Sequence, residues 1–272
     1  MSNNSAVYPA IDPSQLIAQQ AFHDKCVIVT GASRGIGEDA ARTFARAGAS
    51  VVLVARNASQ LEAVERRILQ EVPTARVLKM ALDVTDPRKA EAAIARTVDL
   101  FGGIDVLVAA AVISQTDPHE WWDTVEVNIR GVFNFVRYAL SHLERTQGSV
   151  IAVSSISSQL RIPSGSDYSV SKHALTRFIE FIPIEHPNVR AFSIHPGSIL
   201  TDLAKNSGFP AALFPDKVEL ASALILHLAA RKADWLSGRY VSACWDMREL
   251  ERDWKEKVLR KGALVNRFYL PS

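Results

Sequence analysis

Residues 26–37 constrain the fold of this chain more than any other stretch. Residues 26–29 form an apolar run with three consecutive β-branched side chains and no charge, as in a strand buried on both faces of a parallel sheet. From residue 38 onward, apolar residues return every three or four positions, which is typical of an amphipathic helix. Between the two patterns lie three glycines, Gly31, Gly35 and Gly37. We therefore expect a strand, a glycine-rich turn and a helix.

A turn of this kind can hold the pyrophosphate of a dinucleotide. Glycine lets backbone N–H groups approach the phosphates without obstruction by a Cβ atom. The N-terminus of the following helix adds unpaired N–H donors and the positive end of a dipole. The alternative interpretation is an ordinary strand-to-helix turn that uses glycine only for its shape.

Composition and charge narrow the class of protein. A chain of 272 residues, 48% hydrophobic and 22% charged, is expected to be globular with a substantial core. The net charge of +2 and the scattered positions of the basic residues argue against a nucleic-acid-binding groove and against a basic membrane-binding patch. The two cysteines, far apart in the sequence, form neither a disulfide framework nor a metal site. With no signal peptide and no apolar run of about 20 residues, we expect a cytoplasmic protein.

The second predicted strand, residues 50–55, indicates which dinucleotide would bind. In a doubly wound sheet the end of this strand borders the adenosine ribose. An acidic residue there would bind the 2′-hydroxyl of NAD, but this chain has Ala55 followed by Arg56. Arg56 and Arg34 could clamp a 2′-phosphate, so the sequence favours NADP(H) over NAD(H). The alternative is that Arg56 only extends from a strand end into solvent.

A serine and a Tyr-x-x-x-Lys pair form the candidate catalytic group. Ser155 follows a predicted strand at 149–153, and Tyr168 and Lys172 are spaced to share one helix face. A phenol with a pKa of about 10 is a poor proton shuttle at neutral pH, whereas an adjacent ammonium stabilises the phenolate. Such a pair on its own is more often an accident of a helix surface.

The order and spacing of these motifs resemble the short-chain dehydrogenase/reductase family. The glycine spacing is Gly-x-x-x-Gly-x-Gly, and the matches run from Thr30 to Thr201. The resemblance implies one doubly wound, Rossmann-type α/β domain with a seven-stranded parallel sheet in the order 3-2-1-4-5-6-7. It also implies a homodimer or homotetramer. The segment 238–246 is further similar to fungal members of the family associated with specialised metabolism.

The resemblance assigns a role to each site residue. Tyr168 protonates the substrate oxygen and Ser155 orients it. Lys172 lowers the pKa of Tyr168 and binds the ribose, while Asn128, within a predicted helix at 118–145, holds a water of the proton relay. The implied cofactor-binding residues are Gly31, Ser33, Arg34, Gly35, Ile36, Gly37, Arg56, Asp83, Val84, Tyr168, Lys172, Pro196, Gly197, Ile199 and Thr201.

Two of the neighbouring positions have simpler interpretations. Asp83 would bond the adenine in the family, but an ordinary loop acid or a helix cap before Pro87 accounts for it nearly as well. His195, directly before the Pro-Gly turn, is interpreted as a structural residue rather than as a base.

One segment departs from the family pattern. Where the family usually has Asn-Asn-Ala-Gly after the fourth strand, this chain has Ala109-Ala110-Ala111-Val112. Two amides that would brace the turn are missing, and Val112 cannot take the φ > 0 conformations of glycine. The departure leaves open a cyclase or isomerase that uses bound NADP as a scaffold without net redox chemistry. A cofactor-sensing regulator is a third hypothesis.

The predicted organisation is an N-terminal extension (1–21), one dinucleotide-binding and catalytic domain (22–245), and a C-terminal amphipathic helix and tail (246–272). Within the domain, residues 202–217 are predicted to form a lid over an apolar, fairly bulky substrate, because they combine prolines and a glycine with Phe209, Leu213 and Phe214. The alternative is a surface helix that packs these residues on its own domain. The predicted activity is NADPH-dependent reduction of a ketone, such as a secondary-metabolite intermediate, to an alcohol, or the reverse. No metal is expected.

Overall fold

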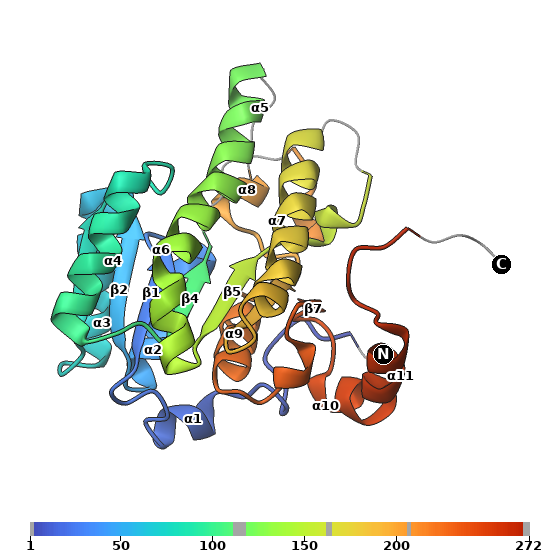
Figure 1. Cartoon of the computed structure of the whole chain (residues 1–272), viewed down its shortest axis with the longest axis horizontal. Coiled ribbons are helices and arrows are strands. Elements are labelled where there is room, and N and C mark those ends of the chain that lie inside the picture. The colour runs from blue at the N-terminus through green and yellow to red at the C-terminus, as the bar shows by residue number, and fades with distance from the viewer. Residues whose placement is uncertain (1–2, 111–117, 162–164, 206–207, 269–272) are drawn as a thin grey trace.

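The computed structural model describes residues 3–110, 118–161, 165–205 and 208–268 (Figure 1). Within these ranges, seven strands pair in parallel in the order β3-β2-β1-β4-β5-β6-β7, which confirms the predicted fold. The strands are β1 (Cys26–Thr30), β2 (Ser50–Ala55), β3 (Val77–Ala81), β4 (Val106–Ala109), β5 (Ser149–Val153), β6 (Arg190–His195) and β7 (Arg239–Ser242).

Helices cover both faces of this sheet. The long ones are α2 (Gly35–Arg46), α3 (Ala58–Glu71), α4 (Pro87–Phe101), α6 (Gly131–Thr146), α7 (Ser166–Glu185) and α9 (Val218–Ala229). The shorter ones are α1 (Ser14–Ala18), α5 (Pro118–Val125), η1 (Glu126–Arg130), η2 (Ile156–Ser158), α8 (Asp202–Lys205), η3 (Ala211–Leu213), η4 (Asp234–Leu236), α10 (Met247–Glu249), η5 (Leu250–Trp254) and α11 (Lys255–Lys261).

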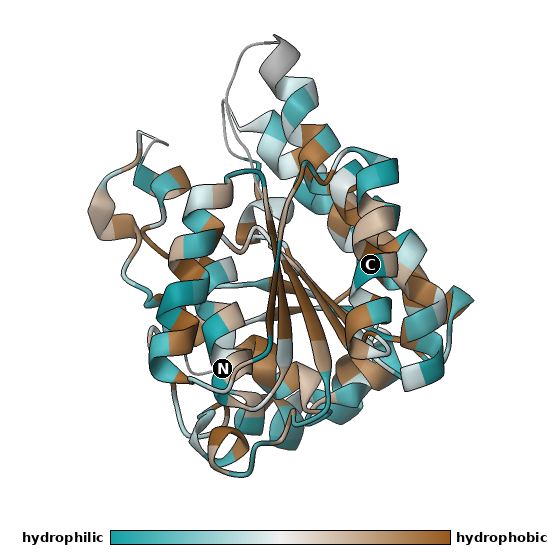
Figure 2. Ribbon diagram, turned by 90° about the vertical axis from the view of Figure 1, so that its left-hand side faces the viewer, coloured by the Kyte–Doolittle hydropathy of each residue, from teal (hydrophilic) through white to brown (hydrophobic). Residues whose placement is uncertain are grey.

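The core consists of two apolar layers, one on each side of the sheet. Successive strand residues point to opposite faces, so Val27 and Val29 pack in one layer and Ile28 packs in the other. The first layer contains side chains of α2, α3 and α9, and the second contains side chains of α4, α6 and α7. Figure 2 shows the hydrophobic strands between the helices. Burial on both faces explains why these strands are continuous apolar runs.

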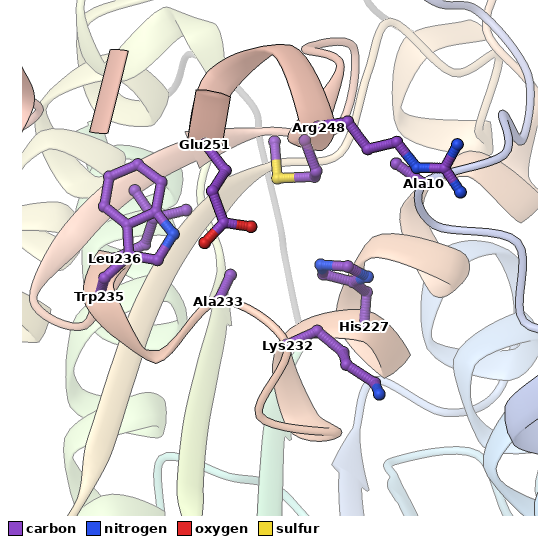
Figure 3. Close-up of a pocket in the computed structure, with 9 residues that line it drawn as sticks. Ala10, His227, Lys232, Ala233, Trp235, Leu236, Arg248 and Glu251 are labelled. Atoms are coloured by element: carbon purple, nitrogen blue, oxygen red, sulfur yellow. The ribbon is translucent and has the colours of Figure 1, made fainter. Parts of the chain in front are cut away.

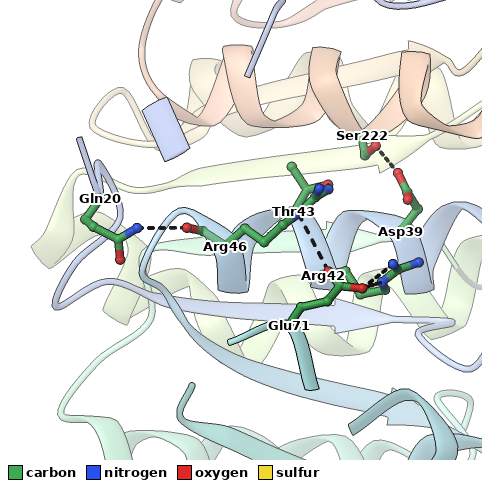
Figure 4. Close-up of polar contacts among 7 residues, drawn as sticks. All are labelled: Gln20, Asp39, Arg42, Thr43, Arg46, Glu71 and Ser222. Carbon is green, nitrogen blue, oxygen red and sulfur yellow. Dashed lines mark hydrogen bonds and ion pairs between the residues drawn. The ribbon is translucent and has the colours of Figure 1, made fainter. Parts of the chain in front are cut away.

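Polar contacts fix α2, the helix that follows the glycine turn, against its neighbours (Figure 4). Asp39 accepts a hydrogen bond from Ser222 of α9, and Arg42 Nε donates to Glu71 of α3 at 2.9 Å. At the far end of the helix, Gln20 donates to the backbone oxygen of Arg46 at 2.9 Å. These contacts hold α2 on both sides, and they thereby fix the direction in which its N-terminus points.

Two predicted helices contain π-helical segments. The predicted helix 118–145 is present as α5, the π-helical η1 and α6, and the π segment contains Asn128. The C-terminal helix is likewise divided into α10, the π-helical η5 and α11, and it ends at Gly262 in the left-handed conformation. Apolar periodicity predicts where a helix lies, but it does not show where a helical turn contains an extra residue and becomes π-helical.

The N-terminal residues pack on the body of the domain. Tyr8 and Ile11 are buried in the first core layer. The Asn4 N–H donates to the Cys244 oxygen at 2.8 Å, and the Lys217 N–H donates to the Ser5 oxygen at 2.9 Å. The N-terminal segment therefore contacts both the loop after β7 and the residue at which the predicted lid ends.

A small cavity of about 220 Å³ lies where the C-terminal helix, the end of α9 and residue Ala10 meet (Figure 3). His227 and Glu251 face it from opposite sides. Glu251 is ion-paired with Lys255 at 2.8 Å, and burial is the main reason that the pKa of His227 falls to about 4. The cavity lies at the packing interface of three segments: the N-terminal segment, the end of α9 with the residues that follow it, and the C-terminal helix.

Substitution of Ile11 by alanine tests whether the N-terminal segment stabilises the domain. Because this side chain is only 1% exposed, Ile11→Ala should lower the free energy of unfolding by about 2–5 kcal/mol in a urea titration. The control is Val7→Ala in the same segment, at an exposed position, which should change it by less than about 0.5 kcal/mol. Equal small effects of both substitutions would contradict the observed packing.

Candidate active site

A cleft of about 1110 Å³ lies at the carboxyl edge of the sheet. Because all strands are parallel, the loops that follow β1, β2, β5 and β6 meet at this edge. Ser155 and every predicted cofactor-binding residue except Lys172 line the cleft. Val218, the first residue of α9, also lines it, whereas His227 near the other end of α9 lines the small cavity. The two cavities are therefore separate.

The glycine turn has a shape that other residues would not permit. Gly31 and Gly35 have φ angles of 71° and 56°, in the region that favours glycine. A Cβ atom on Gly37 would lie 2.3 Å from the backbone oxygen of Gly31. Helix α2 thus begins directly against the end of β1, and Arg34 at its N-cap makes no side-chain cap. This cradle fits a pyrophosphate, whose oxygens would accept hydrogen bonds from the first N–H groups of α2.

The cleft continues past the end of β2, where Arg56, Asn57 and Gln60 line it. The Arg56 side chain is exposed and has no ion pair with any described residue. Arg34 is also exposed, but its Nη1 lies 2.8 Å from Asp202 Oδ2. Two guanidinium groups thus border the part of the cleft where the sequence predicts a 2′-phosphate.

Asp83 and Val84 border the same part of the cleft. The Asp83 carboxylate accepts hydrogen bonds from the backbone N–H and the hydroxyl of Thr85, both at 2.9 Å. Asp86, not Asp83, caps the following helix. The Val84 oxygen accepts a hydrogen bond at 3.0 Å from Asn134, a buried residue of α6. Asn134 was not among the predicted site residues, although a polar residue among apolar helix positions is a signal that the sequence carries.

Ser155 and Tyr168 line the cleft, and Lys172 lies directly behind Tyr168. Ser155 caps η2 by accepting a hydrogen bond from the Ser157 N–H at 3.1 Å. Burial raises the pKa of Tyr168, and a side-chain hydrogen bond with Ser155 partly opposes this rise. Lys172 lies one turn further along α7, with its Nζ 5.7 Å from the centre of the Tyr168 ring. Serine and tyrosine oxygens thus share one hydrogen-bonding site.

Lys172 is held behind Tyr168 and away from solvent. Its side chain is 1% exposed, and its Nζ donates a hydrogen bond to the Val153 oxygen at 2.8 Å. Burial lowers the pKa of Lys172 to about 7. Burial therefore favours the neutral forms of both members of the pair, the phenol and the amine. A group that titrates near pH 7 can accept and release protons at that pH.

Asn128 is completely buried in the π-helical segment and does not line the cleft. Its Nδ2 donates to Ser171 Oγ at 2.9 Å, and Ser171 Oγ donates to the backbone oxygen of Tyr168 at 2.9 Å. Its Oδ1 has no hydrogen-bond partner within the described chain. Asn128 thus contacts α7 through Ser171 and touches neither catalytic side chain in the contacts observed. The predicted relay water stays a prediction.

The loop after β6 is braced from two sides. Asp216 Oδ2 accepts the Ser198 N–H at 2.5 Å, and a Cβ on Gly197 would come within 2.9 Å of the same oxygen. His195 Nδ1 accepts a hydrogen bond from the Ile156 N–H at 3.3 Å. Burial lowers the pKa of His195 to about 4, so the ring is neutral at physiological pH. His195 thus supports the loop that carries Ser155, in keeping with a structural role.

The predicted lid begins and ends on the cofactor side of the cleft. Ile199 bridges to Pro215 and Asp216, which anchors the end of the segment. Phe209 and Phe214 line the cleft, whereas Leu213 is exposed and does not. Residues 206–207 of the lid lie outside the described residues. Of the segment that departs from the family pattern, Ala109 ends β4 and Ala110 lines the cleft, and Ala111 and Val112 lie outside the described residues.

The family model for short chain dehydrogenases matches residues 25–209, well over half of the chain. This chain belongs to the short-chain dehydrogenase/reductase family. The match covers the glycine turn, the serine, tyrosine and lysine of the cleft, and the loop after β6. Members of this family are oxidoreductases that use a nicotinamide dinucleotide and act on small molecules. The chain is therefore an enzyme of this class.

Relatives and solved structures agree with this assignment. The short chain dehydrogenase mpl6 of Monascus purpureus is 38% identical over 93% of this chain and 91% of its own length. This match confirms the resemblance to fungal family members. An alcohol dehydrogenase from the archaeon Thermococcus sibiricus, solved with 5-hydroxy-NADP, is 32% identical with a TM-score of 0.69, over 76% of this chain and 92% of that one. Levodione reductase is 25% identical with a TM-score of 0.75, over 81% and 96%.

Among the described residues, no group of three or more histidine, cysteine, aspartate or glutamate side chains is arranged to hold a metal ion. None of the helices described is both long enough and apolar enough to span a bilayer.

Substitution of Gly37 by alanine tests the cradle. The added Cβ would overlap the Gly31 oxygen, so α2 must move away from β1 and its N–H groups lose their position. We expect Gly37→Ala to weaken NADP(H) binding by roughly tenfold or more, measured by fluorescence titration. The control is Gly103→Ala, where a Cβ would meet only ordinary contacts at 3.8 Å. Unchanged affinity in Gly37→Ala would exclude the cradle as the phosphate site.

Proposed function

We propose that this family member is an NADPH-dependent reductase that converts a ketone of a fairly apolar, bulky small molecule to an alcohol, or catalyses the reverse reaction. The observation that carries the proposal is that Ser155 and Tyr168, with Lys172 behind Tyr168, line the same cleft as the glycine cradle. A proton donor and a dinucleotide site in one cleft are what carbonyl reduction requires.

The residues of the cleft can hold NADP(H) along its whole length. The pyrophosphate would contact the residues of the glycine turn, Gly31, Ser33, Gly35, Ile36 and Gly37. The adenine would contact Asp83 and Val84. The nicotinamide end would contact the loop after β6, at Pro196, Gly197, Ile199 and Thr201. When bound there, the nicotinamide supplies or accepts the hydride.

The residues of the chain itself supply the proton and the geometry. The Ser155 hydroxyl donates a hydrogen bond to the substrate carbonyl oxygen and orients it toward Tyr168. The Tyr168 hydroxyl gives its proton to the same oxygen as the alcohol forms. Lys172 stabilises the resulting phenolate when protonated. Its predicted contact with the ribose stays a prediction, because Lys172 does not line the cleft. Asn128 acts on this group indirectly, because it braces Ser171 and thereby the backbone of Tyr168.

The preference for the phosphorylated cofactor rests on charge. Arg34 and Arg56 border the ribose region, and Ala55 provides no carboxylate to repel a 2′-phosphate. A guanidinium can bind a phosphate through two parallel hydrogen bonds, which favours NADP(H). The Thermococcus relative in complex with an NADP analogue supports this assignment.

The substrate side of the cleft is apolar. Phe209, Phe214 and Ile156 line the same cleft as Tyr168. Together with the similarity to Monascus dehydrogenases, this lining supports a secondary-metabolite intermediate as the substrate. A homodimer or homotetramer and a cytoplasmic location stay predictions from the sequence.

Isotope transfer tests the reaction class. The purified protein is incubated with NADPH deuterated at the transferable position and a metabolite extract of its source, and the products are analysed by mass spectrometry. We expect one deuterium in a new alcohol. A new product without deuterium that still requires bound NADP would replace the proposal with the cyclase or isomerase hypothesis. Redox-sensitive binding of a partner without any product would favour a regulator.

Removal of one oxygen tests the proton donor. Tyr168→Phe should lower kcat by about 10²- to 10⁴-fold, because general acid catalysis is lost, and should leave the Kd for NADPH nearly unchanged. Tyr138→Phe removes a phenolic oxygen from α6 outside the cleft, and it should keep full activity. Undiminished turnover in Tyr168→Phe would refute the assignment of Tyr168.

A further inference from the structure

An ion pair connects the cofactor turn to the start of the lid. Arg34 directly precedes α2, and Asp202 is the first residue of α8. Arg34 Nη1 lies 2.8 Å from Asp202 Oδ2, and both residues line the cleft. Lys205 Nζ lies 3.2 Å from the other oxygen of the same carboxylate. The hydrogen bond from Lys205 and the charge of Arg34 lower the pKa of Asp202, which keeps this carboxylate ionised.

The glycine turn and the residue before the lid lie near each other. A Cβ atom added to Gly35 would be 3.8 Å from the methyl group of Thr201. The Lys205 N–H donates to the Thr201 oxygen at 2.9 Å, which links α8 to the same point. A change in the partner of Arg34 therefore acts directly on the segment from Thr201 to Lys205.

The two arginines of the phosphate region are not equivalent. Arg56 has no ion pair within the described ranges, so a phosphate can bind it without displacing another group. Arg34 already donates to a carboxylate through Nη1, and a carboxylate and a phosphate bind the same N–H edges of a guanidinium. A 2′-phosphate that binds Arg34 through Nη1 must therefore replace Asp202. A cofactor without this phosphate has no such requirement.

We propose that Asp202 competes with the 2′-phosphate of NADP(H) for Arg34, so that NADP(H) releases the start of the lid whereas NAD(H) leaves it attached. The proposal rests on the proposed function, in which Arg34 is a phosphate ligand. Asp202 then has two effects. It weakens the preference for the phosphorylated cofactor, and it transmits occupancy of the phosphate site to the segment that covers the substrate.

Binding of the two cofactors to four forms of the protein tests the competition. The Kd values of NADP⁺ and NAD⁺ are measured calorimetrically for the unsubstituted protein, Asp202→Asn, Arg34→Met and the double variant. Asp202→Asn should tighten NADP⁺ binding roughly two- to fivefold, the range for release of an exposed ion pair, and leave NAD⁺ unchanged. In the Arg34→Met background, Asp202→Asn should have no effect on either cofactor.

A matched control separates competition from net charge. Asp253 is also paired with an arginine, Arg252, at 2.7 Å, but it does not line the cleft. Asp253→Asn makes the same change in net charge and should leave both Kd values unchanged. Equal tightening of NADP⁺ and NAD⁺ by Asp202→Asn, or tightening that persists without Arg34, would overturn the proposal.

The same set of variants distinguishes this inference from the proposed function. If Arg34→Met does not weaken NADP⁺ binding, the assignment of Arg34 as a phosphate ligand fails, and the competition fails with it. If Arg34→Met weakens NADP⁺ binding but Asp202→Asn leaves it unchanged, only the competition fails.

Hydrogen exchange tests the effect on the lid. In the unsubstituted protein, the amides of residues 202–205 should exchange faster with saturating NADP⁺ than with saturating NAD⁺. In Asp202→Asn this difference between the cofactors should disappear, because the attachment to Arg34 is already lost. Equal exchange with both cofactors in the unsubstituted protein would show that the phosphate does not release the lid.

Discussion

The direct contact between the start of α2 and the end of β1 sets the positions of the other parts of the cleft. Only glycine at position 37 allows this approach, because a side chain there would occupy the space of the Gly31 oxygen. The contact aims the free N–H groups of α2 along the carboxyl edge of the sheet. The Asp39–Ser222 and Arg42–Glu71 contacts hold the rest of the helix in that direction. The phosphate cradle is therefore a property of core packing as much as of the turn.

The proposed catalytic group depends on a different constraint, the burial of two α7 side chains, Tyr168 and Lys172. Burial raises the pKa of Tyr168 and lowers that of Lys172, so both side chains favour their uncharged forms. The Val153 oxygen and the Ser155 hydroxyl satisfy their polar atoms without adding a charge. The site thus keeps a phenol and an amine side by side at little electrostatic cost.

The sequence predicted the features that depend on local pattern and on family order. The buried strands follow from apolar runs, and the sheet order follows from the family resemblance. The predicted cofactor-binding residues other than Lys172 line one cleft, and their roles stay predictions. Features made by contacts between distant segments were not predictable in this way. The pairing of Arg34 with Asp202 joins residues 168 positions apart. Burial of Tyr8 and Ile11 likewise depends on a surface assembled from later parts of the chain, and the extra residue near Asn128 leaves no mark in the periodicity.

The attachment of the N-terminal segment has a practical consequence. Residue Ser5 is hydrogen-bonded to Lys217, where the predicted lid ends, and Asn4 is hydrogen-bonded to the loop after β7. Any peptide fused ahead of these residues therefore emerges beside the base of the lid. An affinity tag at the N-terminus can therefore alter the measured kinetics of this enzyme. Substrate affinities are best compared after the tag has been removed.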